Sequence, residues 1–373
     1  MRGRASGLVA AGAILLLMAG CAADKAPPAP LLPVTPTIAG KQVWQQRLDT
    51  RVGFPLAVVV RQGQVIAASD QGVVQGLDLA TGKEVWRANV KSGLSAGVGS
   101  DGRFSAVVTR DNELVTIEAG AERWRKSLDA RVVTAPLVAG ERVFVVGVDR
   151  AVHAYDALDG RKLWTLRRAG DPLTLAQASV LTAYKDTLIV GQGPRLLGVD
   201  SLRGTVRWEA VVATPRGTNE VERLADLIGP AARVGSSFCV RAFQSSIGCV
   251  DAERGALQWS INGGGTQPVA ADADHVFSAD AVDRVSARRR SDGVLLWSNE
   301  RFLNRELSGP VSVGKTVVFG DFEGQVHFLS RETGLTLLRL PTDGSAVVGA
   351  PIVADTTLLV VTRNGGLFAF RPE

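Results

Sequence analysis

Short apolar runs recur along the chain with the same punctuation between them. The clearest copy is VFVVGVDRAVHAYDALDGRKLWTL, residues 143–166. One apolar run leads to a turn, a second run ends at Asp156, and Gly160 and Trp164 follow at fixed offsets. Runs rich in Val and aromatic residues between Gly- and Asp-bearing turns predict antiparallel strands joined by hairpins. The pattern therefore predicts a unit of short strands, with Trp164 on the last one.

This unit returns about every forty residues along the chain. The Asp–Gly–Trp spacing recurs at Asp78, Gly82 and Trp86, at Asp200, Gly204 and Trp208, and at Asp251, Gly255 and Trp259. All seven tryptophans occupy this position or a variant of it: Trp44, Trp86, Trp124, Trp164, Trp208, Trp259 and Trp297. An eighth position carries Leu338, which keeps the spacing from Gly334. Such a period, with short strands and turn residues, is typical of a β-propeller.

The two ends of the chain predict how such a ring closes. The last unit has three strands and lacks a tryptophan strand, whereas residues 41–48, around Trp44, supply a lone tryptophan strand. A four-stranded sheet cannot bury both faces alone, so neighbouring units must pack face to face. We therefore predict an all-β, eight-bladed β-propeller of four-stranded antiparallel blades, with the ring closed by the N-terminal strand. The alternative, an open solenoid, leaves two half-units exposed.

The chain begins with a segment that resembles a bacterial lipoprotein signal. Arg2 and Arg4 precede a short apolar run at residues 8–18, and small residues then lead to Cys21. The resemblance implies that Cys21 becomes the first mature residue and carries a lipid, which anchors the protein to a membrane. An ordinary signal peptide cut near Ala19, with an incidental cysteine, is the alternative.

The lipoprotein pattern divides the chain into three parts. Residues 1–20 form the signal peptide, residues 21–40 the lipidated cysteine with a tether, and residues 41–373 the propeller. Prolines crowd the tether and favour an extended segment outside any packed core, at Pro27, Pro28, Pro30, Pro33 and Pro36. Ala22 rather than Asp follows the cysteine, which in such lipoproteins implies the outer membrane and its periplasmic face.

Charge and cysteine content narrow the partners and the compartment. The formal net charge of +5 is small for 373 residues, so nothing favours nucleic acid as a partner. Cys239 and Cys249 lie in two runs joined by a short turn. If Ala242 pairs with Ser246, the two cysteines face each other within disulfide distance, and the periplasm is oxidising. We predict a cross-strand disulfide, with two small buried thiols as the alternative.

The sequence offers no constellation of catalytic or metal-binding residues. The three histidines, His153, His275 and His327, lie in different units, and no pair has the spacing of metal ligands. Neither a nucleophile elbow nor a phosphate-binding loop is present. The aspartates of the repeat recur in register, which is typical of turn formers. We therefore expect a protein that is not an enzyme and has no cofactor or metal.

Two segments depart from the period and are candidates for a binding surface. The longest spacing, 51 residues between Trp208 and Trp259, places extra residues at 211–230, where charged side chains mix with Val and Leu. The preceding unit carries Leu173 and Leu175 where an inter-blade loop is expected. Charged loops with exposed leucines suit a protein partner, although ordinary loop packing explains both segments equally well.

The Asp–Gly–Trp repeat is similar to that of quinoprotein-type (PQQ-like) propellers, and the whole chain resembles the outer-membrane protein assembly factor BamB family. The most specific match is TNEVERLADL, residues 218–227, which is close to a distinctive loop of that family. The resemblance implies a non-catalytic scaffold of the β-barrel assembly (BAM) complex. Such a scaffold binds the periplasmic POTRA domains of BamA and aids insertion of β-barrel proteins into the outer membrane. It also implies a second role, the pairing of edge strands with unfolded outer-membrane proteins.

The family resemblance also implies which residues contact the partner. The candidates are Leu173, Leu175 and Asp226, which match family contact positions, together with Glu222 and Arg223 of the matching loop. Two positions depart from the family pattern. Ala176 stands where the family has a basic residue, and Ile228 stands where it has a second acid. Part of the polar contact is therefore expected to be lost or rebuilt here.

Two other functions share the propeller fold. A pyrroloquinoline-quinone dehydrogenase would carry adjacent paired cysteines, a calcium site and long insertions, whereas Cys239 and Cys249 are ten residues apart. A periplasmic propeller that binds another protein or a cell-wall ligand would lack only the match at residues 218–227. These alternatives stay open on the sequence alone.

Overall fold

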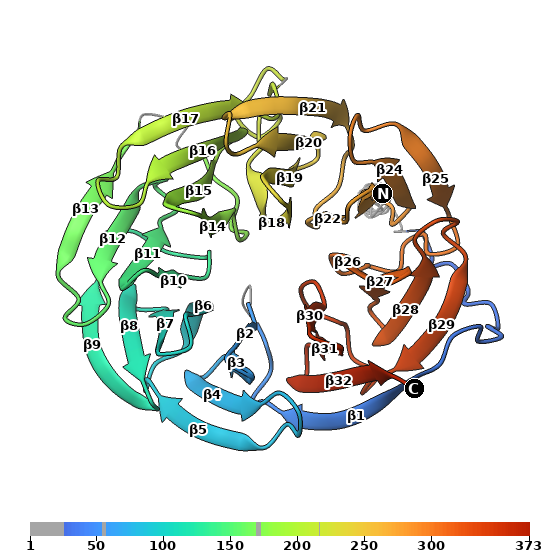
Figure 1. Cartoon of the computed structure of the whole chain (residues 1–373), viewed down its shortest axis with the longest axis horizontal. Helices are drawn as coiled ribbons and strands as arrows, with labels where there is room; N and C mark the ends of the chain where they lie inside the picture. Colours follow the sequence, from blue (N-terminus) through green and yellow to red (C-terminus); the bar gives the residue numbers. More distant parts are fainter. Residues whose placement is uncertain (1–25, 54–56, 169–172, 216) are drawn as a thin grey trace, which may run out of the picture.

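Eight four-stranded antiparallel sheets are arranged as blades around a central axis (Figure 1). The computed structural model describes residues 26–53, 57–168, 173–215 and 217–373. Within these ranges the regular structure consists of strands β1 to β32, and no helix is present. The predicted fold, an all-β propeller of eight blades, is confirmed.

Blades one to four use consecutive strands, numbered from the centre outwards. Blade one comprises β2 (Val59–Arg61), β3 (Gln64–Ala68), β4 (Val73–Asp78) and β5 (Glu84–Asn89). Blade two comprises β6 (Leu94–Ser100), β7 (Phe104–Thr109), β8 (Glu113–Glu118) and β9 (Ala121–Ser127). Blade three comprises β10 (Leu137–Ala139), β11 (Arg142–Val146), β12 (Val152–Asp156) and β13 (Lys162–Leu166). Blade four comprises β14 (Leu181–Tyr184), β15 (Thr187–Gln192), β16 (Arg195–Asp200) and β17 (Val206–Val211).

Blades five to seven repeat this order, and blade eight combines both ends of the chain. Blade five comprises β18 (Leu227–Val234), β19 (Ser237–Ala242), β20 (Ser246–Asp251) and β21 (Ala256–Asn262). Blade six comprises β22 (Ala270–Ala271), β23 (His275–Ala279), β24 (Val285–Arg289) and β25 (Leu295–Asn299). Blade seven comprises β26 (Val311–Val313), β27 (Thr316–Gly320), β28 (Gln325–Ser330) and β29 (Thr336–Pro341). Blade eight comprises β30 (Ile352–Ala354), β31 (Thr357–Val361), β32 (Gly366–Pro372) and β1 (Gly40–Arg47).

The hydrophobic core is divided among the gaps between neighbouring blades. Successive side chains of a strand point to opposite faces of its sheet, so a central strand serves two gaps. In β15, Leu188 and Val190 pack against blade three, whereas Ile189 packs against blade five. Because both faces are buried, the inner strands read as continuous apolar runs rather than as an alternation of apolar and polar residues.

The tryptophans lie on the outermost strands and connect one blade to the next. Five indole N–H groups donate to a backbone carbonyl of the following blade: Trp44 to Leu79 (3.0 Å), Trp124 to Ala157 (2.8 Å), Trp164 to Ser201 (3.1 Å), Trp259 to Arg290 (2.7 Å) and Trp297 to Arg331 (2.8 Å). Trp86 instead donates to Gln64 of its own blade. The glycine of the repeat is needed beneath the ring, because a Cβ on Gly204 would lie 2.5 Å from Trp164.

The two ends of the chain close the ring as predicted. Strand β1 pairs antiparallel with β32, from Gly40 opposite Pro372 to Arg47 opposite Gly366. Trp44 then makes the same contact with blade one as the other tryptophans make with their neighbours. Leu338, which replaces tryptophan at the eighth position of the repeat, packs on the next blade in the same way. A Cβ on Gly40 of blade eight would lie 3.3 Å from the Leu338 side chain.

The repeated aspartates form the turns before the outermost strands. Asp200 accepts hydrogen bonds from the Leu202 and Arg203 amides at 3.0 and 2.9 Å, and Arg207 donates to it at 2.7 Å. The Arg207 hydrogen bond, followed by these amides, lowers the pKa of Asp200 to about 2. Gly204 then takes a φ of +72°, a conformation that glycine adopts without strain. Asp78, Asp156 and Asp251 accept the corresponding amide hydrogen bonds.

The proline-rich segment differs from the free tether that its composition predicts. Residues 26–39 lie along the outside of the ring and hydrogen-bond to blade seven and to the loop before it. The described residues before Gly40 belong to no helix or strand, but several of their backbone carbonyls accept hydrogen bonds from the propeller. Cys21 lies outside the described residues. Among those that are described, no helix has the length and apolar character to cross a bilayer.

Candidate partner-binding site

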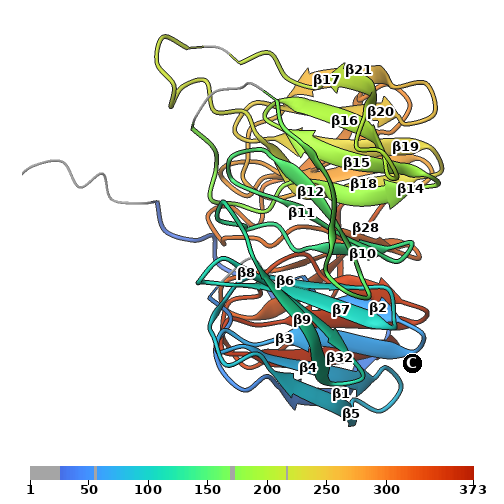
Figure 2. The same cartoon turned by 90° about the vertical axis from the view of Figure 1, so that its left-hand side faces the viewer.

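Both segments that depart from the repeat lie on the same face of the ring. Residues 173–180 lead from β13 to β14, and residues 212–226 lead from β17 to β18. In antiparallel blades, every connection from an outer strand to the next inner strand emerges on one face, together with the turns between the two central strands. Figure 2 shows these long connections projecting on one side of the disc. The β11–β12 turn, which carries Arg150, also lies on this face.

A polar cluster joins these three segments. The Arg150 Nη2 atom donates to the Asp226 carboxylate at 3.2 Å and to the Leu173 carbonyl at 3.1 Å. The other Asp226 oxygen accepts the Leu175 amide at 2.8 Å. Gln192 donates to the Arg150 carbonyl at 2.6 Å and fixes the β11–β12 turn from blade four. We call the Arg150–Asp226 pair, with the two leucine backbones that it holds, the clasp.

The clasp presents apolar side chains beside a charged groove. Leu173 and Leu175 are half-buried. The groove next to Leu173 has a volume of about 500 Å³ and is lined by Arg168, Arg195, Glu220 and Arg223 among others. Glu209 is paired with both Arg168 and Arg195, which holds these two guanidinium groups at the rim. The site therefore combines an apolar centre with a mainly basic border.

Glu222 and Arg223 have different roles within the 218–227 loop. The Glu222 carboxylate accepts the Thr218 amide at 2.8 Å and its hydroxyl at 3.2 Å, while Asn219 accepts the Glu222 amide at 2.9 Å. These bonds, led by the Thr218 amide, lower the pKa of Glu222. Glu222 thus shapes its own loop in the manner of a capping box. Arg223 is exposed and lines the groove.

The expectation of exposed leucines in this insertion is correct only in part. Val221 is 69% exposed, but Leu227 and Ile228 are each 1% exposed because they begin β18, and Leu227 enters the core between blades four and five. Leu224 is half-buried at the groove. The apolar part of the surface therefore comes from Leu173, Leu175, Leu224 and the exposed Val221, and not from Leu227 and Ile228.

The two cysteines lie in the middle of the two central strands of blade five. Strands β19 and β20 pair Ala242 with Ser246 and Cys239 with Cys249. The cysteines are joined by a disulfide, with Cα atoms 4.0 Å apart, and both side chains lie in the core between blades five and six. The bridge ties the two central strands of the blade that carries the long insertion.

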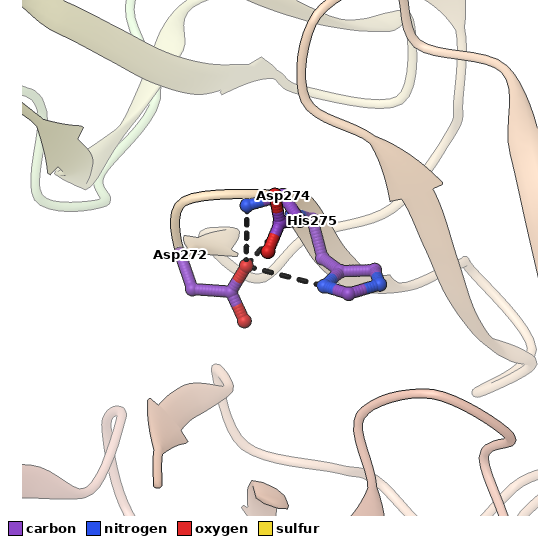
Figure 3. Close-up of side chains that lie close together, drawn as sticks. All are labelled: Asp272, Asp274 and His275. Atoms are coloured by element: carbon purple, nitrogen blue, oxygen red, sulfur yellow. Dashed lines mark hydrogen bonds and ion pairs between the residues drawn. The ribbon is translucent and has the colours of Figure 1, made fainter. Parts of the chain in front are cut away.

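One group of side chains has the composition of a metal site, on the opposite face of the ring. Asp272, Asp274 and His275 lie together in the turn between β22 and β23 (Figure 3). However, one Asp272 oxygen accepts the amides of Asp274 and His275 at 2.9 and 2.8 Å, and the other faces Ser312 and Arg331. The carboxylate is therefore occupied by donors, and the group is a turn of the same kind as the Asp200 turn.

Comparison with known proteins identifies the family. A sequence profile described as outer membrane protein assembly factor BamB matches residues 70–299 and 293–373. The chain is also 34% identical to the outer membrane protein assembly factor BamB of Burkholderia pseudomallei, over 98% of this chain and 97% of that protein. The chain belongs to the BamB family. It is thus related to factors of outer-membrane protein assembly, and its PQQ-like repeats are those of this family.

Solved structures confirm the fold and show how widely it is shared. The crystal structure of BamB from Moraxella catarrhalis covers 89% of this chain and 99% of its own, with 24% identity and a TM-score of 0.81. A quinohemoprotein alcohol dehydrogenase from Comamonas testosteroni also matches, with 14% identity, coverage of 89% and 76%, and a TM-score of 0.68. The propeller therefore does not distinguish a BamB protein from a dehydrogenase, and the family match does.

The two departures from the family pattern have different surroundings. Ile228 is a core residue, so it presents no side chain to a partner. Ala176 is exposed and lines a second groove together with Arg110 and Arg131. Basic side chains from neighbouring segments thus surround the position at which the family pattern has its own basic residue. The sequence pattern does not single out Arg150 either, because its partner Asp226 lies 76 residues away and in another blade.

Proposed function

We propose that this protein is a non-catalytic scaffold of the outer-membrane β-barrel assembly complex, and that the clasp face binds the POTRA domains of BamA. The observation that carries the proposal is the Arg150–Asp226 pair. Arg150 binds the Leu173 carbonyl and Asp226 binds the Leu175 amide, so the pair holds the loop of the two leucines against the loop that carries Asp226. Family membership supports the assembly role. Localisation at the outer membrane, lipid-anchored through Cys21 and facing the periplasm, is part of the same proposal.

The physical character of the clasp face supports a protein partner. Interfaces between proteins commonly have an apolar centre that excludes water and a polar border that confers specificity. Leu173 lines the groove that Arg168, Arg195 and Arg223 border, and Leu175 lines a neighbouring pocket that shares Arg150 and Asp226 with it. We therefore expect the partner to present an apolar residue flanked by carboxylates.

The decisive experiment is a detergent pull-down from outer membranes with the tagged, full-length chain, followed by a titration against purified POTRA domains. The combined change of Leu173→Ala, Leu175→Ala and Asp226→Asn should weaken POTRA binding at least tenfold. A matched control replaces Leu158, Asp159 and Leu202, which lie in exposed turns on the opposite face, and should bind as the unchanged chain does.

Two results would contradict the proposal. Recovery of a different periplasmic protein in place of BamA would favour the alternative of a propeller with another partner. Unchanged POTRA binding by the clasp variant, with its fold intact by circular dichroism, would place the contact surface elsewhere. Titration with pyrroloquinoline quinone and calcium tests the enzymatic alternative, for which the proposal expects no saturable binding.

A further inference from the structure

The proline-rich segment docks on the ring through its backbone. We call residues 27–37 the strap. The Ala29 amide donates to the Leu303 carbonyl at 2.8 Å, and the Thr37 amide donates to the Leu337 carbonyl of β29 at 2.9 Å. Between these two points the strap passes over Phe302, Thr336 and Arg339. Both ends of the strap are therefore attached to the propeller.

Three side chains of the ring bind the carbonyls of the strap. Arg305 Nη1 donates to the Ala29 carbonyl at 3.0 Å, and Asn304 donates to the Pro27 carbonyl at 3.3 Å. Arg339 Nη1 donates to the Leu32 carbonyl at 3.2 Å. Proline has no amide hydrogen but retains its carbonyl, so a proline-rich chain is best bound by donors of this kind.

The two arginines that hold the strap are themselves fixed in the ring. Asp321 and His327 are fully buried, and Asp321 accepts from Arg305 Nε at 2.9 Å and contacts His327 Nε2 at 3.0 Å. Arg339 Nε donates to His327 Nδ1 at 3.3 Å. The donors are thus positioned by a buried cluster, which distinguishes this docking from a chance contact of a surface arginine.

The strap begins on the clasp face. Its first attachment is to residues 303–305, which connect the outer strand β25 to the inner strand β26. By the antiparallel order of the blades, this connection emerges on the same face as residues 173–180 and 212–226. Figure 2 agrees, since the described N-terminal residues leave the disc on the side where the long connections project.

Docking shortens the distance available to a lipid on Cys21. Extended chain spans at most about 3.5 Å per residue, so Cys21 can lie no farther than about 28 Å from Ala29. If the chain were free up to the start of β1 at Gly40, the limit would be about 67 Å. The attached strap therefore more than halves the reach of the anchor and fixes its point of departure.

We propose that the strap orients the ring, so that the clasp face is held towards the outer membrane and the opposite face towards the periplasm. This inference rests on the lipidation of Cys21 in the proposed function. In this orientation the clasp lies close to the membrane surface, so a partner would bind the clasp near the bilayer. A free tether of the same length would allow either face to approach the membrane.

The test compares the two faces of the lipidated, full-length chain on phosphatidylethanolamine–phosphatidylglycerol vesicles that carry an acceptor dye on the headgroup. A donor dye is attached at Val221→Cys on the clasp face or at Leu202→Cys on the opposite face, both exposed positions. A six-residue strand spans about 20 Å, so the two dyes differ clearly in distance from the bilayer. Energy transfer from position 221 should exceed that from position 202 at least twofold.

Two variants connect this orientation to the strap. Replacing residues 27–37 by Gly and Ser at equal length leaves the ring unchanged and should bring the ratio of energy transfer towards one. Arg339→Met should lower the ratio, whereas its matched control Arg331→Met, whose side chain pairs with Asp272 and Glu332 rather than with the strap, should keep it. Equal transfer in the unchanged chain, or an unchanged ratio after strap replacement, would overturn the inference.

Vesicle flotation before the measurement separates this inference from the proposed function. A chain that does not float with vesicles contradicts lipidation of Cys21 and overturns both the anchor and the orientation. A chain that floats with equal transfer from both positions overturns the orientation alone. The pull-down of BamA is a separate measurement and depends on neither dye.

Discussion

The outer wall of the ring and the clasp face are built in opposite ways. The wall repeats one contact, in which a tryptophan of one blade covers the glycine of the next and in most cases donates to its backbone. The clasp occurs once, and it uses an ion pair between residues 76 apart in sequence. Blade four takes part in both, since its outer strand carries Trp208 and its connections carry Leu173 and Leu175.

This difference separates stability from recognition. Each inter-blade gap buries its own apolar cluster, so stability is distributed around the ring and no single loop determines it. In the proposed function, recognition depends on a few side chains of the clasp face, which lie in connections that depart from the repeat. A change in the wall should therefore destabilise without altering specificity, and a change in the clasp should do the reverse.

The largest effect is expected from a wall tryptophan. Trp124 is 8% exposed and donates to Ala157 at 2.8 Å, so Trp124→Ala should lower the free energy of unfolding by about 3–5 kcal/mol. Urea denaturation measures this loss. POTRA binding by the folded fraction should stay within twofold of the unchanged chain. A loss of binding without a loss of stability would break the division between wall and clasp.

The next largest effect on stability is expected from removal of the disulfide. It closes a loop of ten residues, so Cys239→Ala with Cys249→Ala should lower the free energy of unfolding by about 2–3 kcal/mol. The same loss is expected on reducing the unchanged chain, whereas the variant should show no further response to a reductant. A variant as stable as the parent would show that the apolar packing of blade five suffices without the bridge.

The buried histidine beneath the strap gives a pH dependence. Burial lowers the pKa of His327, and the opposing contact with Asp321 does not reverse this shift. The stability that His327 contributes is therefore present above the ordinary imidazole pKa of about 6.5, and it is lost as the pH falls below that value.

Urea unfolding at pH 7.5 and pH 5.5 should show a loss of up to about 1.4 kcal/mol from this residue. Burial raises the pKa of Asp321, but hydrogen bonds from His327 and Arg305 outweigh it and leave that pKa lowered, so further loss follows below pH 4. His327→Gln should reduce the difference between pH 7.5 and 5.5. An equal difference in the variant and the parent would assign the effect to other groups, such as His153, whose pKa burial also lowers.

The smallest effect on stability is expected at the clasp. Arg150→Met should change the free energy of unfolding by less than about 1 kcal/mol, because the pair with Asp226 is partly exposed to solvent. POTRA binding should nevertheless fall about tenfold, since both loops lose their common partner. Adding Asp226→Asn to the Arg150→Met variant should then weaken POTRA binding little further. Additive losses in this double-mutant cycle would show that the two residues act independently.

The candidate site was predictable only in part. The longest tryptophan spacing indicates residues 211–230 as a candidate binding segment, and Leu173 and Leu175 indicate residues 169–181; that these segments bind a partner stays a prediction. The spacing does not distinguish Val221, which is exposed, from Leu227 and Ile228, which enter the core. Nor does it indicate Arg150, because a single arginine in a short turn has no periodic pattern. The strap was missed for a related reason, since composition describes the stiffness of a proline-rich segment but not the donors that it meets.

The sequence by itself determined the eight blades, the closure by Trp44 and the register of Cys239 with Cys249. These features depend on short apolar runs bounded by turn residues and, for the blades, on a spacing that repeats, so that each copy supports the assignment of the others. Only the tertiary structure decided that Arg150, Asp226 and Leu175 meet, and that the strap lies on Arg305 and Arg339. Such contacts form because the closed ring brings segments together that are far apart in sequence. The residues that make these contacts do not recur at the period of the repeat, so the sequence pattern does not reveal them.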